Sequence, residues 1–277
     1  LIADWGGGDP LVLGDRRAAS ALEAEAARLI GRATPIGSDQ RQPRRTRLGG
    51  DHAKGFCLTA MDQGIGAGED AREFEMASGE MTTSAFRTFL ADTLGACAKG
   101  SRDGAVHFVC MDWRHMADVE AVGADVYSSL LNICVWNKSN AGMGSLYRSK
   151  HEMVFVYKVG SAAHINAVEL GRHGRYRTNV WDYPSVNSLQ GSRREDLDMH
   201  PTVKPVALVA DALCDVTRRG DLVLDIFLGS GTSLIAAERV GRRFCGLDID
   251  PAYVDVAIDR WVAVTGGTPA LVARAAD

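Results

Sequence analysis

The stretch DIFLGSGTSLIAAE at residues 225–238 decides the fold of this chain. It continues an apolar run over Asp221–Phe227, turns through Gly229 and Gly231, and goes on with the apolar spacing of a helix. A second apolar run, typical of a strand, follows over Arg243–Asp248. This alternation of strand, helix and strand predicts a parallel sheet with helices on both faces.

The glycine turn and the acid that follows it form a candidate binding site. Ligands of open α/β sheets bind beyond the carboxyl ends of the strands, where glycines let a ligand approach the backbone and a helix N-terminus offers free N–H groups. Asp248 ends the next strand, and its carboxylate can accept the two hydroxyls of a ribose. The turn is therefore either a binding site for an adenosine-bearing cofactor or an ordinary connection between a strand and a helix. Leu234 stands where a dinucleotide fingerprint needs glycine, which argues against a dehydrogenase.

The composition is that of an ordinary globular protein, with 46% apolar and 24% charged residues among 277. The formal net charge of -4 requires that any nucleic-acid surface be local. No apolar run reaches the ~18–20 residues of a membrane span, and no Cys-x-x-Cys pair suggests a zinc ribbon. We therefore expect a cytoplasmic protein with no membrane contact and no metal.

Patterns upstream extend this architecture, except in residues 1–54. That segment joins an Ala-rich helical pattern to the string QRQPRRTR, and we expect it to be atypical and partly disordered, its arginines being either solvated or in contact with phosphates. The remaining apolar runs predict strands at 56–61, 105–111, 130–136 and 152–158, and helices at 86–100, 114–122, 205–217 and from Pro251 onward.

Three motifs in a fixed order carry a family resemblance. The string HPTVKP at 200–205 precedes DIFLGSGTSLIAAE, and GLDIDPAYVDVA follows at 246–257. In this order they resemble the C-terminal half of the S-adenosylmethionine-dependent DNA amino-methyltransferases, the N4-cytosine/N6-adenine group, and more narrowly its permuted subgroup, whose catalytic half comes first. The strings HFVCMDWRHM at 107–116 and VWNKSNAGMGSLYRSKHE at 135–152 look like a bacterial or phage branch of DNA modification methylases that is sometimes fused to a ParB-like domain.

The resemblance implies a Rossmann-like methyltransferase sheet of about seven strands with helices on both faces. It implies methylation of an exocyclic amine in double-stranded DNA, with adenine N6 favoured over cytosine N4, as in restriction–modification, by a monomer or homodimer. Methylation of RNA or a small molecule is the weaker alternative. The expected parts are a methyltransferase domain at 55–265, with a DNA-recognition region at 136–199 and a cofactor-binding half at 200–265, and a tail at 266–277.

The resemblance also assigns residues to S-adenosylmethionine. Lys204 would pair with the carboxylate of its methionine end, although a solvated lysine is the plain alternative. The full set of expected cofactor-binding residues is Asp225, Phe227, Gly229, Gly231, Thr232, Asp248, His200, Thr202 and Lys204.

One family element is missing from the sequence. The reaction centre of such enzymes is a turn of Asp, Asn or Ser followed by two prolines and an aromatic residue, and no such tetrapeptide occurs here. Where the resemblance places it stands MDQGIG at 61–66, in which Asp62 is a candidate amine acceptor or a plain loop residue. A shifted reading frame upstream would explain the loss. The alternative function is therefore a catalytically impaired remnant that binds cofactor or DNA without turnover.

A basic segment stands out between Trp136 and Arg194. It holds nine Lys and Arg residues against three acids in a chain of net negative charge. Arginines mixed with aromatic residues suit phosphate contact and base stacking, although a solvated loop is the simpler reading. The candidate DNA-binding residues are Lys138, Arg148, Arg172, Arg175, Arg177 and Tyr176.

Overall fold

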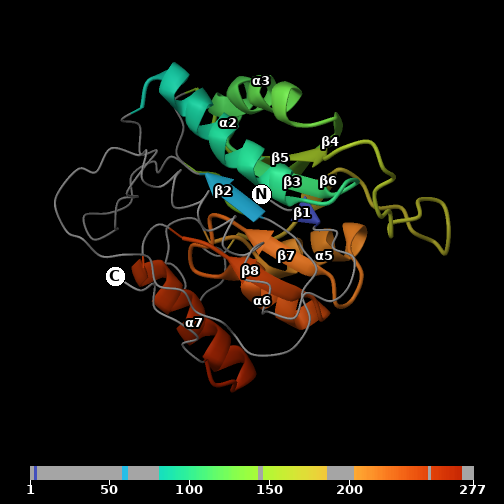
Figure 1. Cartoon of the computed structure of the whole chain (residues 1–277), viewed down its shortest axis with the longest axis vertical. Helices are drawn as coiled ribbons and strands as arrows, with labels where there is room; N and C mark the ends of the chain where they lie inside the picture. The colour runs from blue at the N-terminus through green and yellow to red at the C-terminus, as the bar shows by residue number, and fades with distance from the viewer. Residues whose placement is uncertain are drawn as a thin grey trace.

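The computed structural model describes residues 3–4, 58–61, 81–142, 146–185, 203–248 and 251–269 (Figure 1). Several sequence-based expectations lie outside these residues. They are the helical pattern at 16–32, the tail after residue 269 and the site candidates Asp62, His200 and Thr202.

Eight strands form two sheets in the described part of the chain. The larger sheet has the order β2-β3-β5-β4-β6, and the smaller has the order β1-β7-β8. The strands are β1 (Ala3–Asp4), β2 (Leu58–Met61), β3 (Val106–Met111), β4 (Ser129–Asn137), β5 (His151–Lys158), β6 (Val180–Asp182), β7 (Leu222–Asp225) and β8 (Arg243–Gly246).

This arrangement differs from the expected single parallel sheet of about seven strands in two respects. First, β1 pairs antiparallel with β7 and contacts β3, while β2 contacts β7, so the two sheets meet edge to edge. A strand from the N-terminal segment therefore takes the edge of β7 that a continuous sheet would use. Second, β5 runs antiparallel to both β3 and β4, because the connection from β4 to β5 contains no crossover helix in its described residues.

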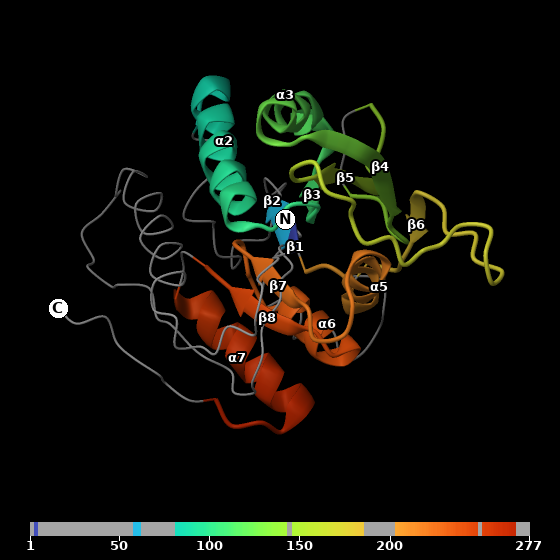
Figure 2. The ribbon, with the colours of Figure 1, turned by 45° about the vertical axis from the view of Figure 1, so that its right-hand side comes forward.

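Helices cover both faces, which confirms the α/β architecture (Figure 2). One cluster buries α2 and α3 against one side of β3 and β5, and a second buries α5 and α6 against the other side, with β7 contributing to both. The helices are α2 (Thr83–Gly100), α3 (Met116–Val126), α5 (Val206–Val216), α6 (Thr232–Val240) and α7 (Pro251–Thr265), with the short 3-10 helix η1 (Trp113–His115) before α3.

Alternation along β3 explains how one strand serves both layers. Phe108 and Cys110 face the α5 and α6 side, whereas Val109 and Met111 face α2 and α3. All six residues of the strand are buried, as expected for the centre of a sheet covered on both faces. Because β7 contributes Val223 to one cluster and Leu224 to the other, the smaller sheet packs into the same two layers as the larger one.

Among the described helices, none is long and apolar enough to cross a membrane. Within the same residues, no three His, Cys, Asp or Glu side chains gather in an arrangement that could hold a metal ion.

Candidate functional site

The predicted glycine turn and Asp248 lie side by side beyond the carboxyl ends of β7 and β8. The backbone N–H of Gly229 donates to Oδ2 of Asp248 at 2.7 Å, and Leu228 N–H donates to the carbonyl of Leu247 at 2.9 Å. Gly229 and Gly231 have φ of 52° and 79°, a region that favours glycine. The Asp248 carboxylate is half-buried, whereas Gly229 and Gly231 are buried, and this carboxylate is an acceptor that fits the hydroxyls of a ribose.

Asp225 shapes this turn from inside. Its side chain is 1% exposed, Oδ1 accepts the N–H of Phe227 at 3.0 Å, and Oδ2 accepts the hydroxyl of Ser233 at 2.5 Å. Burial raises the pKa of Asp225 to about 7, although both hydrogen bonds act to lower it. The Asp225 carboxylate therefore holds the strand-to-helix turn in place through its hydrogen bonds to Phe227 and Ser233.

Phe227 and Gly231 link the turn to its neighbours in different ways. The ring of Phe227 meets that of Phe89 on α2 at 6.0 Å between centroids, edge to face. A Cβ on Gly231 would lie 2.7 Å from the Cβ of Ala257, so this glycine permits the close packing of α6 on α7. Thr232, the first residue of α6, is buried.

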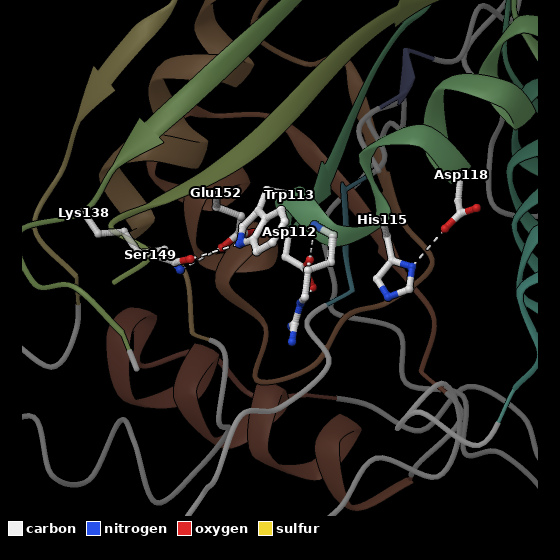
Figure 3. Close-up of polar contacts among 8 residues, drawn as sticks. Asp112, Trp113, His115, Asp118, Lys138, Ser149 and Glu152 are labelled. Atoms are coloured by element: carbon white, nitrogen blue, oxygen red, sulfur yellow. Dashed lines mark hydrogen bonds and ion pairs between the residues drawn. The ribbon is translucent and has the colours of Figure 1, made fainter. Parts of the chain in front are cut away.

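Lys204 is held in a buried ion triad with Glu152 and Lys138. Its Nζ lies 2.6 Å from Oε1 of Glu152. The Nζ of Lys138 lies 3.1 Å from Oε2 of the same carboxylate (Figure 3). Lys204 and Glu152 are only 4% and 6% exposed. Burial alone would raise the pKa of Glu152, but the two lysines outweigh it and lower the pKa to about 2. The triad therefore carries one net positive charge.

The triad and the glycine turn share one edge of the fold. Glu152 lies near the start of β5, which is antiparallel to β3 and therefore begins where β3 ends. The thiol of Cys110, near the end of β3, feels the charges of Lys204, Glu152 and Asp225 together, while burial raises its pKa. Lys204, through its ion pair with Glu152, thus lies at the end of β3, and the cofactor-binding role that the sequence assigns to it stays a prediction.

Sequence reasoning missed Glu152, which it counted only as an opposing charge in the basic segment. The available signal was its position in HEMVFVYK, where an acid stands at the head of an apolar strand. An acid is rarely buried without a partner, so this pattern predicts a nearby cation. It does not identify that cation, because Lys138 and Lys204 come from two separate segments.

A second polar cluster follows β3 at the same edge (Figure 3). Nδ1 of His115 lies 3.0 Å from Oδ2 of Asp118, and Nε of Arg87 donates to Oδ1 of the same carboxylate at 2.7 Å. The indole N–H of Trp113 donates to the hydroxyl of Ser149 at 3.0 Å. These contacts tie η1 to α2, α3 and the loop before β5.

The predicted DNA-binding residues fall into two groups. Arg172, Arg175 and Tyr176 lie exposed in the loop before β6, and Tyr176 is 77% exposed. The guanidinium of Arg175 donates to the carbonyl of Ala167 at 2.9 Å and lies 3.8 Å from a carboxylate oxygen of Glu169. This loop therefore presents two exposed arginines and an exposed tyrosine.

The other three basic candidates bind within the chain. Nε of Arg177 lies 2.5 Å from a carboxylate oxygen of Asp215, and its guanidinium stacks over Trp181. Arg148 donates to two loop carbonyls, and Lys138 belongs to the ion triad. Their charges are thus engaged by the fold, and their contact with DNA stays a prediction.

Comparisons with known proteins identify DNA methyltransferases as relatives of this chain. A family model described as DNA methylase, for N6 and N4 methyltransferases, matches residues 64–259. The DNA adenine methyltransferase YhdJ of Escherichia coli is 36% identical over 88 residues, which make up 32% of this chain and 29% of that protein. The matched part is thus less than a third of the length of the curated relatives.

Solved structures share the fold. PvuII DNA methyltransferase, which is cytosine-N4-specific, has a TM-score of 0.58 at 14% identity, covering 75% of this chain and 78% of that one. TTHA0409 of Thermus thermophilus, crystallised with S-adenosyl-L-methionine, has a TM-score of 0.56 at 19% identity, covering 75% and 89%. At such identities these likenesses establish the fold alone.

Proposed function

This chain belongs to the N6/N4 DNA methylase family, and we propose that it transfers a methyl group from S-adenosylmethionine to an exocyclic amine of a DNA base. The observation that carries the proposal is the contact of Gly229 with Asp248 at 2.7 Å beyond the ends of two parallel strands. Glycines beyond the carboxyl ends of parallel strands, next to a carboxylate, suit a nucleoside.

Each residue of the site has a defined task in this proposal. The cofactor supplies an activated methyl group when bound. Asp248 accepts hydroxyl hydrogen bonds, the turn at Gly229 and Gly231 admits the ligand next to the backbone, and Asp225 keeps that turn in place from below. Since no metal or covalent intermediate is invoked, catalysis depends mainly on positioning the two reactants.

The ion triad supplies positive potential for an anionic group. Lys204 is almost fully buried and paired with Glu152, so it acts through the field of the whole triad, whose net charge is positive. The carboxylate at the methionine end of the cofactor is the group we propose for this field. His200 and Thr202, which lie outside the described residues, are proposed as neighbours of the same end.

Adenine N6 is the favoured target and double-stranded DNA the favoured substrate. The E. coli relative, at 36% identity, is named as an adenine methyltransferase, whereas the cytosine-specific structure is only 14% identical. The exposed Arg172, Arg175 and Tyr176 suit contact with phosphates and bases outside the cofactor site.

A second candidate function is binding of cofactor or DNA without turnover. It is favoured by one property of the sequence: no two of the eight prolines are adjacent, so the Pro-Pro-containing acceptor turn is absent. Asp62 is the remaining candidate acceptor after β2 and lies outside the described residues.

A paired experiment separates these functions. Calorimetric titration of S-adenosylmethionine into the full chain measures binding, and transfer of a tritiated methyl group to unmethylated plasmid DNA measures turnover. Asp248→Ala should abolish binding, whereas the exposed Asp125→Ala on α3 should leave it unchanged. Binding with transfer supports methylation, and chromatography of the hydrolysed DNA then identifies the modified base. Binding without transfer selects the second function, and absence of binding to cofactor and DNA rejects both.

A further inference from the structure

Trp113 differs from the other described tryptophans in its exposure. It is 55% exposed, whereas Trp136, Trp181 and Trp261 are 3%, 5% and 7% exposed. Single exposed apolar side chains are common on protein surfaces, so exposure alone assigns no role. The contacts and the position of this indole supply the argument.

The indole of Trp113 is fixed in orientation. Its Nε1 donates to Oγ of Ser149 at 3.0 Å, a contact drawn in Figure 3. The preceding Asp112 caps η1, since its Oδ1 accepts the backbone N–H of Arg114 at 2.7 Å. An aromatic face held in this way loses little conformational entropy when a ligand stacks on it.

Two ring contacts on α2 place this segment beside the glycine turn. Phe86 meets the ring of His115 at 4.8 Å, and Phe89 meets the ring of Phe227 at 6.0 Å. Residues three apart on a helix are neighbours on one face, so η1 and the turn lie along the same side of α2, about one helical turn apart. Trp113 is therefore exposed at the sheet edge that carries the candidate cofactor site.

The charge of Arg114, the residue after Trp113, is paired with Asp112. The guanidinium of Arg114 donates to both oxygens of Asp112, at 3.1 Å and 3.0 Å, so their charges offset each other. An aromatic face binds nucleobases through their π faces, and this stacking does not release counterions as a phosphate contact does.

We propose that Trp113 is a platform on which an unpaired nucleobase of DNA stacks during methylation. The inference rests on the proposed function and adds to it a binding residue outside the glycine turn, the ion triad and the basic loop. Ser149 acts as a positioning residue, because it holds the indole without meeting the base.

The test measures DNA binding by the full chain as a function of salt. The probes are a single-stranded 20-mer of mixed sequence and the matching duplex with one mismatched adenine, both followed by fluorescence anisotropy. Trp113→Ala should weaken binding by about 10- to 100-fold and leave the slope of log K against log salt unchanged. Trp113→Phe, which keeps an aromatic face, should cost less than about threefold, and Ser149→Ala should fall between them.

A second readout holds even where Trp113→Ala fails to fold. The background is Trp5→Phe, because residue 5 lies outside the described residues. Among the tryptophans that the structure describes, Trp113 is then the exposed one, so DNA should quench its fluorescence emission. The quenching should disappear in Trp113→Phe, while Val264→Ala, which trims an exposed apolar side chain on α7, should change neither readout.

The outcomes separate the two proposals. If the natural chain binds DNA and Trp113→Ala binds equally well, or if the variant flattens the salt slope as a lost phosphate contact would, this inference is overturned and the proposed function stands. If the natural chain binds neither DNA nor cofactor, the proposed function fails, and the inference fails with it.

Discussion

Asp225 and Glu152 are two buried carboxylates at the same edge of the fold, and their pKa values move in opposite directions. Both are at most 6% exposed. Asp225 receives hydrogen bonds from a hydroxyl and a backbone N–H, and burial raises its pKa to about 7. Glu152 sits between two lysines, and its pKa falls to about 2 despite an opposing effect of burial. Burial acts to raise both pKa values, and only the two lysine charges around Glu152 outweigh it.

The difference separates two ways of building a site. Neutral donors around Asp225 fix the geometry of a turn without placing strong charge beside a ligand. Two lysines around Glu152 join the loop after β4 to the segment before α5, and leave a positive field at the edge. Asp225 thus determines the geometry of the glycine turn, whereas Glu152 and its two lysines determine the electrostatic potential at this edge.

Replacing Glu152 by Gln should have the largest effect. The variant removes the negative charge between the two lysines and turns an N–H₂ group toward one of them, so the buried ammonium of Lys204 loses its ion pair with Glu152. We expect the free energy of unfolding to fall by about 3–5 kcal/mol, measured by urea denaturation at pH 7. The stabilisation that Glu152 contributes is present above pH 4.5 and is lost as the pH falls toward 2, so the variant should lose that acid-dependent component.

Glu169→Gln is the matched control for Glu152→Gln. Glu169 also lies between two bases, His173 at 3.7 Å and Arg175 at 3.8 Å, but its side chain is 41% exposed. Its replacement should cost less than about 0.5 kcal/mol, because exposed pairs are screened by solvent. Equal losses at the two positions would contradict the buried triad.

The two lysines should differ in their importance to stability. Lys204 has a side chain 3% exposed and Lys138 one that is 24% exposed. Lys204→Met should cost about 3 kcal/mol, because Glu152 keeps only the partly hydrated Lys138, whereas Lys138→Met should cost about 1 kcal/mol. Denaturation of both variants at pH 7 measures the difference.

A double variant sharpens this ranking. Glu152→Met combined with Lys204→Met replaces the buried pair by apolar side chains of similar length, and should be less destabilised than Glu152→Gln alone. A double variant as unstable as the sum of its single variants would show that the two residues act independently.

Much of the cofactor-binding half could be predicted from the sequence, because the ends of its helices are set by residues close to them in the sequence. The helix expected directly after Gly231 is α6, whose two caps, Gly231 and Gly241, adopt left-handed φ. The expected helix 205–217 lies within one residue of α5 at each end. Glycine turns and apolar periodicity are read directly from neighbouring residues.

What depends on distant partners could not be predicted. An apolar run such as Glu152–Lys158 carries no information about strand direction, so the antiparallel place of β5 was missed. The strand Ala3–Asp4 is only two residues long and gains its place by pairing with β7. The role of Glu152 was hidden because its lysines lie 14 and 52 positions away in the sequence.

Asp225→Asn should change the pH dependence of stability more than stability itself. Because folding raises the pKa of this acid from 3.8 to about 7, the folded state binds more protons than the unfolded state between these values. Asp225 therefore makes stability fall as the pH rises through this window, by about 1.4 kcal/mol per pH unit at most. Denaturation of the variant at pH 4, 5.5 and 7 should show this slope removed, and an unaltered slope would mean that Asp225 is already ionised in the folded protein at pH 4.

Ser233→Ala should have the smallest effect on the free energy of unfolding. It separates the contribution of the Ser233–Asp225 hydrogen bond from that of burial. The Ser233 hydroxyl donates to Oδ2 of Asp225, so its loss should cost about 1 kcal/mol at pH 8, where the carboxylate is charged, and less at pH 5, where the acid is protonated. Ser161→Ala is the matched control, since its hydroxyl donates to the exposed Asp103 at 3.4 Å and should cost less than about 0.5 kcal/mol at either pH. If Ser233→Ala costs the same at pH 5 and pH 8, the loss comes from packing, and Asp225 owes its position to burial and to the N–H of Phe227 alone.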